Sequence, residues 1–148
     1  MTFPSITTTP RRKDLDWLLE DFIQRVPGVQ QAVLGSRDGV KLSFAGLGDD
    51  DADQLAAVMS SLYALGRGEV TVPGHDVRQV IIETDDGFTY VMSSGGEMPA
   101  DAGAAVVRSV VGVRTSTDAD PGVVGHEMVR LITGVAEHLL TPTRSPGQ

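Results

Sequence analysis

The sequence predicts an α+β fold, with a five-stranded, mostly antiparallel sheet and three helices in the order α-β-β-α-β-β-β-α. Three segments place apolar residues at the 3.6-residue period of an amphipathic helix. Shorter segments between them are rich in β-branched residues or alternate apolar with polar residues, as strands do. Asp-Gly steps at 38–39 and 86–87 are typical of tight turns between antiparallel strands.

Length and composition narrow the classes of protein that fit. The 148 residues suit a single domain, which we place at 13–140 between flexible tails at 1–12 and 141–148. The absence of cysteine excludes disulfides, thiolate catalysis and cysteine-based metal sites. A net charge of −8 argues against a nucleic-acid partner, because phosphate binding needs clustered Lys and Arg. No apolar run approaches the roughly 18 residues of a membrane helix and no sorting signal is recognisable, so we expect a cytoplasmic protein without direct membrane insertion.

The first helix is predicted over 14–26, and Pro27 and Gly28 end it. Six apolar residues share its buried face: Leu15, Leu18, Leu19, Phe22, Ile23 and Val26. Trp17 lies beside this face, either as a half-buried aromatic at the edge of the core or as a contact for a partner.

A hairpin is predicted directly after this helix. Its strands span 29–36 and 40–45, around a two-residue turn at Asp38-Gly39, where both residue types accept a positive φ at low cost. Alternation in the second strand predicts one buried face, with Val40, Leu42 and Phe44.

The second helix is predicted over 51–66 and has an apolar core stripe and a stripe of small residues. The core stripe is expected to contain Leu55, Val58, Met59, Leu62 and Leu65. A stripe of small residues lies beside it: Ala56, Ala57, Ser60, Ser61 and Ala64. Small residues allow another backbone to come close, so this stripe fits either tight packing on the protein's own sheet or an interface with another chain.

Acidic residues precede the second helix. Asp49, Asp51 and Asp53 have the spacing of a calcium loop, but Gln54 and Ser60 stand where such a loop needs Gly and Glu. We therefore interpret them as an acidic N-cap and first helical turn, which the helix dipole favours.

Three more strands and a last helix complete the predicted fold. The strands are placed at 77–83, 88–92 and 104–114, with a loop at 93–103. In the middle one, Phe88, Tyr90 and Met92 share a face. The third helix begins with Asp120 near its N-cap and Pro121 at its first position. Its buried face is expected to contain Val124, Met128, Leu131, Ile132, Val135 and Leu139.

No pattern in the sequence indicates catalysis, a metal or a cofactor. The chain has no Gly-x-Ser-x-Gly elbow and no Gly-x-x-x-x-Gly-Lys-Ser/Thr phosphate loop. His75, His126 and His138 lack the spacing of metal ligands. We therefore expect a protein that is not an enzyme.

Several motifs together resemble the roadblock / dynein light-chain family over residues 14–140. They are Leu18-Leu19-x-x-Phe22-x-x-x-Val26-Pro27-Gly28-Val29, Ser36-Arg37-Asp38-Gly39-Val40, Leu55-Ala56-Ala57-x-x-x-Ser61-Leu62, and Pro121-Gly122 before a helix with Glu127-Met128. The chain is most similar to the small bacterial members, which the resemblance places in operons with a sensor kinase and a Ras-like GTPase. The fold implied is of the roadblock/longin type.

The resemblance implies a homodimer that regulates or scaffolds the small GTPase encoded nearby, with the sensor kinase of the same operon as a further partner. It also implies that the third strands pair edge to edge and the second helices lie side by side. The interface residues expected on this basis are Ala56, Met59, Ser60, Tyr63, Ala64, Val77, Gln79 and Ile81. Arg37 and Arg67 are candidate contacts for the GTPase, and solvation at the surface is the simpler role for both.

Two other classes of function stay open at this point. A small-ligand sensor of profilin, PAS or GAF architecture also packs helices on an antiparallel sheet, and it needs a pocket of some hundreds of Å³ between them. An acyl- or acetyl-transferring enzyme ranks last, because no phosphate-binding loop is visible.

Overall fold

The computed structural model describes residues 12–93 and 109–140. The segments 1–11, 94–108 and 141–148 lie outside the described residues, and with them the predicted tails, most of the predicted loop and the first residues of the predicted last strand. The helices are the 3-10 helix η1 (Lys13–Leu15), α1 (Asp16–Arg25), α2 (Asp49–Arg67) and α3 (Pro121–Leu140). The strands are β1 (Val29–Ser36), β2 (Lys41–Ala45), β3 (Val80–Thr84), β4 (Gly87–Ser93) and β5 (Ser109–Ser116).

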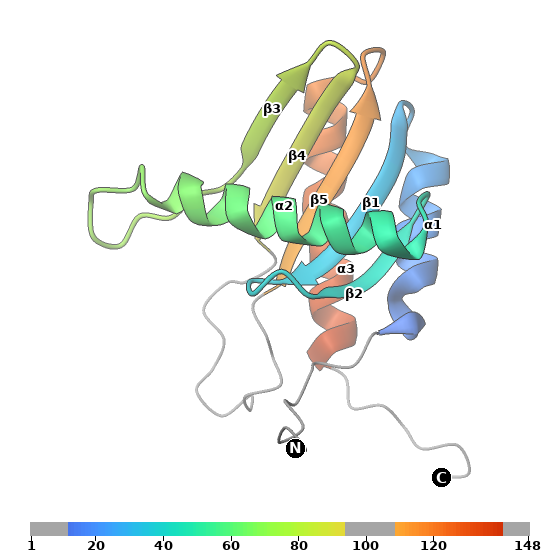
Figure 1. Ribbon diagram of the computed structural model, residues 1–148, viewed down its shortest axis with the longest axis horizontal. Helices are drawn as coiled ribbons and strands as arrows, with labels where there is room; N and C mark the ends of the chain where they lie inside the picture. The colour runs from blue at the N-terminus through green and yellow to red at the C-terminus, as the bar shows by residue number, and fades with distance from the viewer. Residues whose placement is uncertain (1–11, 94–108, 141–148) are drawn as a thin grey trace, which may run out of the picture.

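The strands form one antiparallel sheet in the order β2-β1-β5-β4-β3. Helix α2 crosses one face of this sheet, and α1 and α3 cover the other, so the domain has three layers (Figure 1). The predicted fold class and element order are confirmed. Among the helices in the described part of the chain, none combines the length and apolar character needed to cross a bilayer.

Two hydrophobic clusters fill the spaces on either side of the sheet. Strand β1 supplies both, because successive side chains point to opposite faces: Ala32 and Leu34 face α1 and α3, and Val33 faces α2. In β4, Tyr90 and Met92 lie on the α1/α3 side with Phe88 packed beside them, as predicted, and Val91 lies on the α2 side. A sheet buried on both faces explains why the β5 segment lacks clean alternation.

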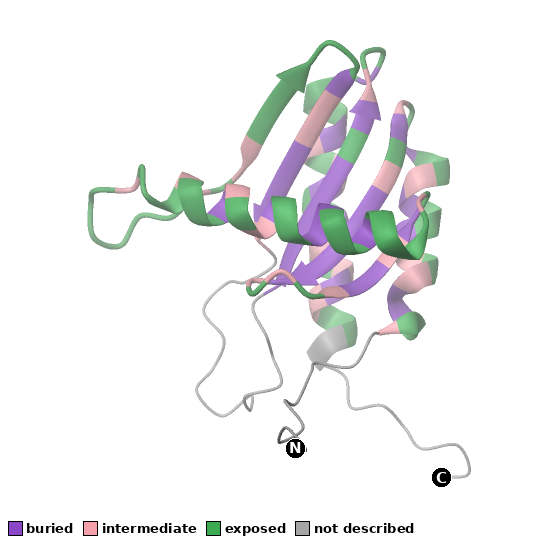
Figure 2. Cartoon of the chain, viewed as in Figure 1, coloured by how far each residue is buried: buried purple, intermediate pink, exposed green. Residues whose placement is uncertain are grey.

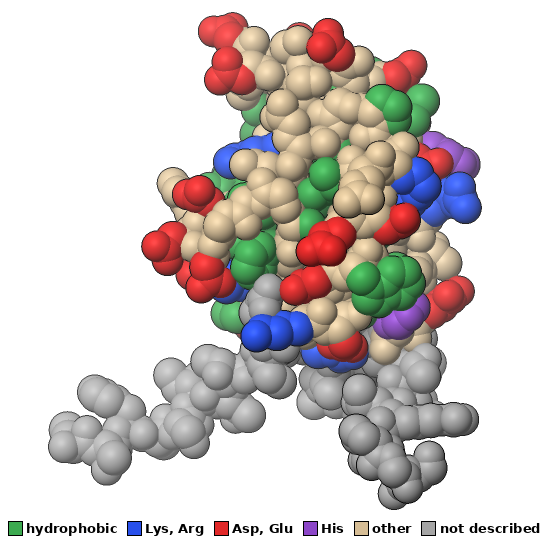
Figure 3. Space-filling model, turned by 90° about the vertical axis from the view of Figure 1, so that its right-hand side faces the viewer, with side chains coloured by type: hydrophobic (Ala, Val, Ile, Leu, Met, Phe, Trp, Pro, Cys, Tyr) green, Lys and Arg blue, Asp and Glu red, His purple; other side chains and the backbone are tan. Residues whose placement is uncertain are grey.

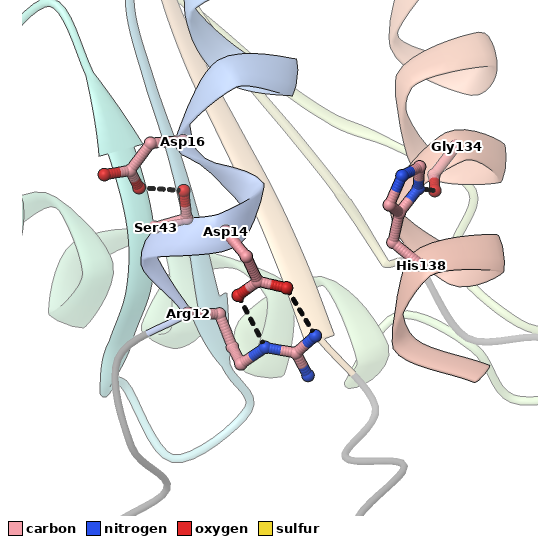
Figure 4. A network of polar contacts seen from close by, with 6 residues as sticks. All are labelled: Arg12, Asp14, Asp16, Ser43, Gly134 and His138. Atoms are coloured by element: carbon pink, nitrogen blue, oxygen red, sulfur yellow. Dashed lines mark hydrogen bonds and ion pairs between the residues drawn. The ribbon is translucent and has the colours of Figure 1, made fainter. Parts of the chain in front are cut away.

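The first helix is shorter than predicted, because residues 13–15 form the 3-10 turn η1. Its buried face is confirmed, with Leu18 and Ile23 at the margin. A polar network fixes the start of the helix (Figure 4). Arg12 binds both carboxylate oxygens of Asp14 and lowers the pKa of that carboxyl group. The Ser43 hydroxyl donates to Asp16, which ties α1 to β2.

The hairpin between β1 and β2 differs from the prediction in its turn. The connection runs from Arg37 to Val40, the Gly39 N–H donates to the Ser36 carbonyl at 3.0 Å, and only Gly39 has a positive φ. The pairing of β1 with β2 also shifts register between Leu34 and Gly35. The expected single face of β2 is therefore wrong.

Its three apolar residues separate. Leu42 joins the α1/α3 cluster, Phe44 packs against the α2 cluster, and Val40 is exposed.

The third strand begins three residues later than predicted, at Val80, so Val77 and Gln79 precede β3. The predicted start of the third helix is confirmed: Asp120 Oδ1 accepts hydrogen bonds from the Gly122 and Val123 N–H groups at 2.9 and 3.3 Å. The predicted acidic N-cap of the second helix is wrong, because the N-cap is Gly48. The predicted acidic first turn is confirmed, with Asp49, Asp50 and Asp51. Lys41 pairs there with Asp49 and Asp53.

Candidate interaction surface

The inner face of α2 is fixed by two glycines in the central strands. Met59 lies over Gly35 of β1 and Gly112 of β5, and a side chain at either glycine would collide with it. Ala52, Leu55, Ala56 and Tyr63 continue this face toward both ends of the helix. The close approach of helix and sheet at Met59 therefore depends on strand positions that have no side chain.

The opposite side of α2 remains open. We call Ala57, Val58, Ser61, Ala64 and Leu65 the outward face of α2; all five side chains are exposed (Figure 2). Val58 is 37% exposed and Leu65 is 73% exposed. Their predicted place in the core stripe is wrong, because a different face of α2 packs on the sheet. That face consists of Ala52, Leu55, Ala56, Met59 and Tyr63.

The outward face combines three small residues with Val58 and Leu65, and it carries no charge. No charged residue occurs between Asp53 and Arg67, although 22% of the chain is charged. The Ser61 hydroxyl donates to the Ala57 carbonyl at 2.9 Å, which satisfies it within the helix. A solvated helix face normally carries Lys, Glu or Gln, so the lack of charge on this face favours contact with another surface.

Strand β3 forms an open edge of the sheet. Within residues 12–93 and 109–140, it pairs only with β4. Ile81 is 50% exposed, and Ile82 is also among the exposed large hydrophobic residues. Val80 packs against the α2 cluster, so alternation places Ile82 on the α2 side of the sheet and Ile81 on the α3 side. An apolar edge of this kind invites pairing with another strand.

The structure distributes the eight expected interface residues over several environments. Ala56, Met59 and Tyr63 are buried against the protein's own sheet. Ser60 is half-buried beside the β1–β2 loop, and Val77 is half-buried against the α2 cluster. Gln79 is half-buried and lies near Gly125 of α3. Ala64 and Ile81 are exposed.

The sequence offered little to separate the two stripes of α2. Val58 and Leu65 look like core residues by their chemistry alone. The signal that assigns the stripes is the pair Gly35 and Gly112, which lie far away in the sequence and face Met59. That pairing is visible only once β1 and β5 are neighbours.

The two arginines expected to contact a partner differ in setting. Arg67 is exposed in the last turn of α2. Arg37 is half-buried, and its guanidinium carbon lies 5.2 Å from the centre of the Tyr63 ring. The structure thus packs Arg37 against Tyr63 of α2 and leaves Arg67 exposed at the end of that helix.

Charged groups elsewhere form ordinary ion pairs. Arg25 of α1 binds Glu127 of α3 and lowers the pKa of that carboxyl group, and the Asp49 carboxylate raises the pKa of Lys41. Burial raises the pKa of Tyr90, whose hydroxyl has no partner among the described residues. Figure 3 shows acidic side chains spread in several groups over the side of the molecule that it displays. Within 12–93 and 109–140, no three His, Asp or Glu side chains are grouped to hold a metal ion.

An open cavity of about 630 Å³ lies between α3 and the segment that precedes β3. Val77, Met92, Val129 and Ile132 supply its apolar wall. The Gln79 Nε2 amide in the same wall is buried without a partner in the described part of the chain. Its size falls in the range of small-molecule sites.

Comparisons with known proteins agree with this architecture. The family model described as Roadblock/LC7 domain matches residues 15–98, which include α2 and β3. A Roadblock/LC7 domain from Streptomyces avermitilis is 38% identical, covers 85% of this chain and 98% of its own, and has a TM-score of 0.73. A second such domain from that organism is 31% identical, with 83% and 99% covered and a TM-score of 0.63.

A more distant structure shares the fold. It is described as MglB with tetrameric arrangement, is 16% identical, covers 92% of this chain and 96% of its own, and has a TM-score of 0.69. The search of curated proteins gave no match.

Proposed function

The chain belongs to the Roadblock/LC7 domain family, and from this membership we propose that it is a homodimeric, non-enzymatic adaptor that regulates a small Ras-like GTPase in a bacterial signalling system. The GTPase encoded nearby is the expected partner, and a sensor kinase of the same operon is a further one. The adaptor acts in the cytoplasm.

The observation that carries the dimer proposal is the uncharged outward face of α2 beside an unpaired apolar edge. Val58 and Leu65 lie on a helix of 19 residues, which is about 28 Å long. Ile82 of β3 lies on the same side of the sheet. A second copy related by a twofold axis can cover both features at once, since each surface then meets its own equivalent.

The proposed contact therefore moves from the residues first expected to the outward face of α2 and the β3 edge. Ala64 stays in this surface, and Ala57, Val58, Ser61 and Leu65 join it. Ile82 replaces Ile81, because Ile81 lies on the α3 side of the sheet. Ala56, Met59 and Tyr63 support it from behind by holding α2 against the sheet. The multi-chain arrangement in the description of the MglB structure supports self-association of this fold.

The GTPase half of the proposal rests on family membership. The sequence contains no Gly-x-x-x-x-Gly-Lys-Ser/Thr phosphate loop, which fits an adaptor of a GTPase better than a GTPase. Pull-down of the neighbouring GTPase, loaded with GDP or with a non-hydrolysable GTP analogue, should recover it with this chain in at least one state. Absence of binding in both states would remove this half.

The proposed homodimer predicts the effect of one substitution on α2. Val58→Glu places a charge in the proposed contact and should shift the sedimenting species from dimer to monomer at micromolar concentration, with helical content unchanged. Val129→Glu is the matched control, because Val129 is 55% exposed on α3. A dimer that survives Val58→Glu, or a wild-type chain that sediments as a monomer, would contradict the proposal.

A small-ligand sensor is the alternative, and the family match does not favour it. The cavity beside α3 is the feature that would serve it, with the Gln79 amide as a donor to a ligand. A ligand-induced rise in melting temperature that is lost in Gln79→Ala would support this alternative.

A further inference from the structure

Arg37 is a half-buried cation with incomplete hydrogen bonding. It follows β1 in the β1–β2 loop. Its Nη2 donates to Tyr63 Oη at 3.3 Å and to Ser93 Oγ at 3.5 Å, both long distances for hydrogen bonds. Its Nε is buried and has no acceptor among the described residues. A buried donor without an acceptor is costly, so the described residues satisfy this guanidinium poorly.

Other basic side chains of the described region are either paired or exposed. Arg12, Arg25, Lys41 and Arg130 each form an ion pair with a carboxylate. Lys13, Arg67, Arg78 and Arg114 form none there, and all four are exposed to water. Within residues 12–93 and 109–140, only Arg37 is both half-buried and without a carboxylate partner.

Tyr63 holds the guanidinium in place. Its ring lies 5.2 Å from Arg37 Cζ, a cation–π distance. Its hydroxyl accepts from Arg37 and donates to Asp76 Oδ1 at 3.5 Å, while the Val77 N–H donates to the same Asp76 oxygen at 2.8 Å. Tyr63 is buried, so the ring that orients Arg37 is itself fixed by the core.

The loop that contains Arg37 adjoins the proposed contact surface. Gly39 of this loop lies against α2, where an added Cβ would be 3.0 Å from Ser60 Oγ and 3.5 Å from the Ala57 Cα. Ala57 belongs to the outward face of α2. The loop therefore lies at the edge of the surface proposed for the second copy, and a GTPase that binds the dimer beside that surface would reach Arg37.

We propose that Arg37 binds an Asp or Glu side chain of the partner GTPase, an assignment that rests on the function proposed above. A carboxylate supplies two acceptors to a planar guanidinium and neutralises a charge that has no carboxylate partner in the described part of the chain. Tyr63 is a positioning residue, because it acts on the partner only through the orientation of Arg37.

The test is the affinity of the full chain for the neighbouring GTPase, in the nucleotide state that binds, at low and at high salt. Arg37→Gln should weaken binding about 10- to 100-fold and reduce its dependence on salt. Arg37→Lys retains the charge but lacks the planar fork, so it should restore only part of the loss. Tyr63→Phe should weaken binding by about threefold, through looser positioning.

Arg130→Gln is the charge-matched control, since Arg130 lies on α3 across the sheet from α2. It should alter the affinity by less than about twofold, as expected for a distant rim charge. Melting temperature and dimer mass of Arg37→Gln should match the wild type. Affinity of Arg37→Gln equal to that of Arg130→Gln would overturn the proposal, as would loss of the dimer in Arg37→Gln. Failure of the wild-type chain to bind would instead overturn the proposed function.

Discussion

At the scale of single residues, the fold depends on one methionine and two glycines. Met59 fills the space between α2 and the sheet above Gly35 and Gly112. It is fully buried together with its neighbours Leu55 and Ala56. This contact fixes which face of α2 is inside, and therefore which residues are left for a partner.

Met59→Ala is expected to lower the free energy of unfolding by about 2–4 kcal/mol, because it removes buried methylene and sulfur contacts and leaves a cavity between helix and sheet. Val129→Ala, an exposed position on α3, should change it by less than about 0.5 kcal/mol. Urea denaturation measures both. Equal effects of the two substitutions would show that Met59 does not anchor α2.

The residue scale is also where prediction from sequence was weakest. Ala56 and Ala64 look alike in the sequence, but the first is buried and the second exposed. Both stripes of α2 are apolar or small, so periodicity alone could not decide which one meets the sheet. Tertiary packing decided it, through glycines more than twenty residues away on one side and fifty on the other.

At the scale of elements, the two helices on one face of the sheet are joined by charge as well as by packing. Arg25 in the last turn of α1 binds both Asp21 of its own helix and Glu127 of α3. The pair lowers the pKa of Glu127 below its ordinary value of 4.5. A carboxyl group with a lowered folded-state pKa stabilises the fold above the unfolded-state value, and this contribution is lost as the pH falls through the folded-state value.

Glu127→Gln should therefore make stability less sensitive to acid. From neutral pH to below 4.5, the urea midpoint of the wild type should fall more steeply than that of the variant, because only the wild type loses this ion pair by protonation. Glu69→Gln, at an exposed position after α2, serves as the control and should follow the wild type. Parallel curves for Glu127→Gln and the wild type would contradict this role of the pair.

Elements were easier to predict than their details. The helix at 121 was predictable from Asp120 and Pro121, because the cap and the first residue are local signals. The turn at Asp38-Gly39 was not, since only Gly39 has a positive φ and the register shifts beside it. The start of β3 was also misplaced, because Val77, a β-branched residue, lies before the strand.

At the scale of the whole molecule, the two free surfaces lie where a second copy can cover both. The outward face of α2 and the Ile82 side of β3 belong to one side of the sheet, while α1 and α3 close the other (Figure 1). Family membership could be predicted from motifs between helices and strands, such as Pro27-Gly28 and Arg37-Asp38-Gly39. The contact surface could not, because it consists of what the folded chain leaves uncovered.

Disulfide cross-linking tests this surface most directly, because the chain contains no cysteine. Single cysteines at Ala57, Ser61 and Ala64 would lie on the outward face, and Thr133→Cys on α3 is the exposed control. Two α2 helices in contact across a twofold axis should bring at least one position within the roughly 4.4–6.8 Å between Cα atoms that a disulfide requires. The account predicts a covalent dimer for at least one α2 position and not for Thr133→Cys. Cross-linking at none of the α2 positions, in a chain that sediments as a dimer, would contradict it.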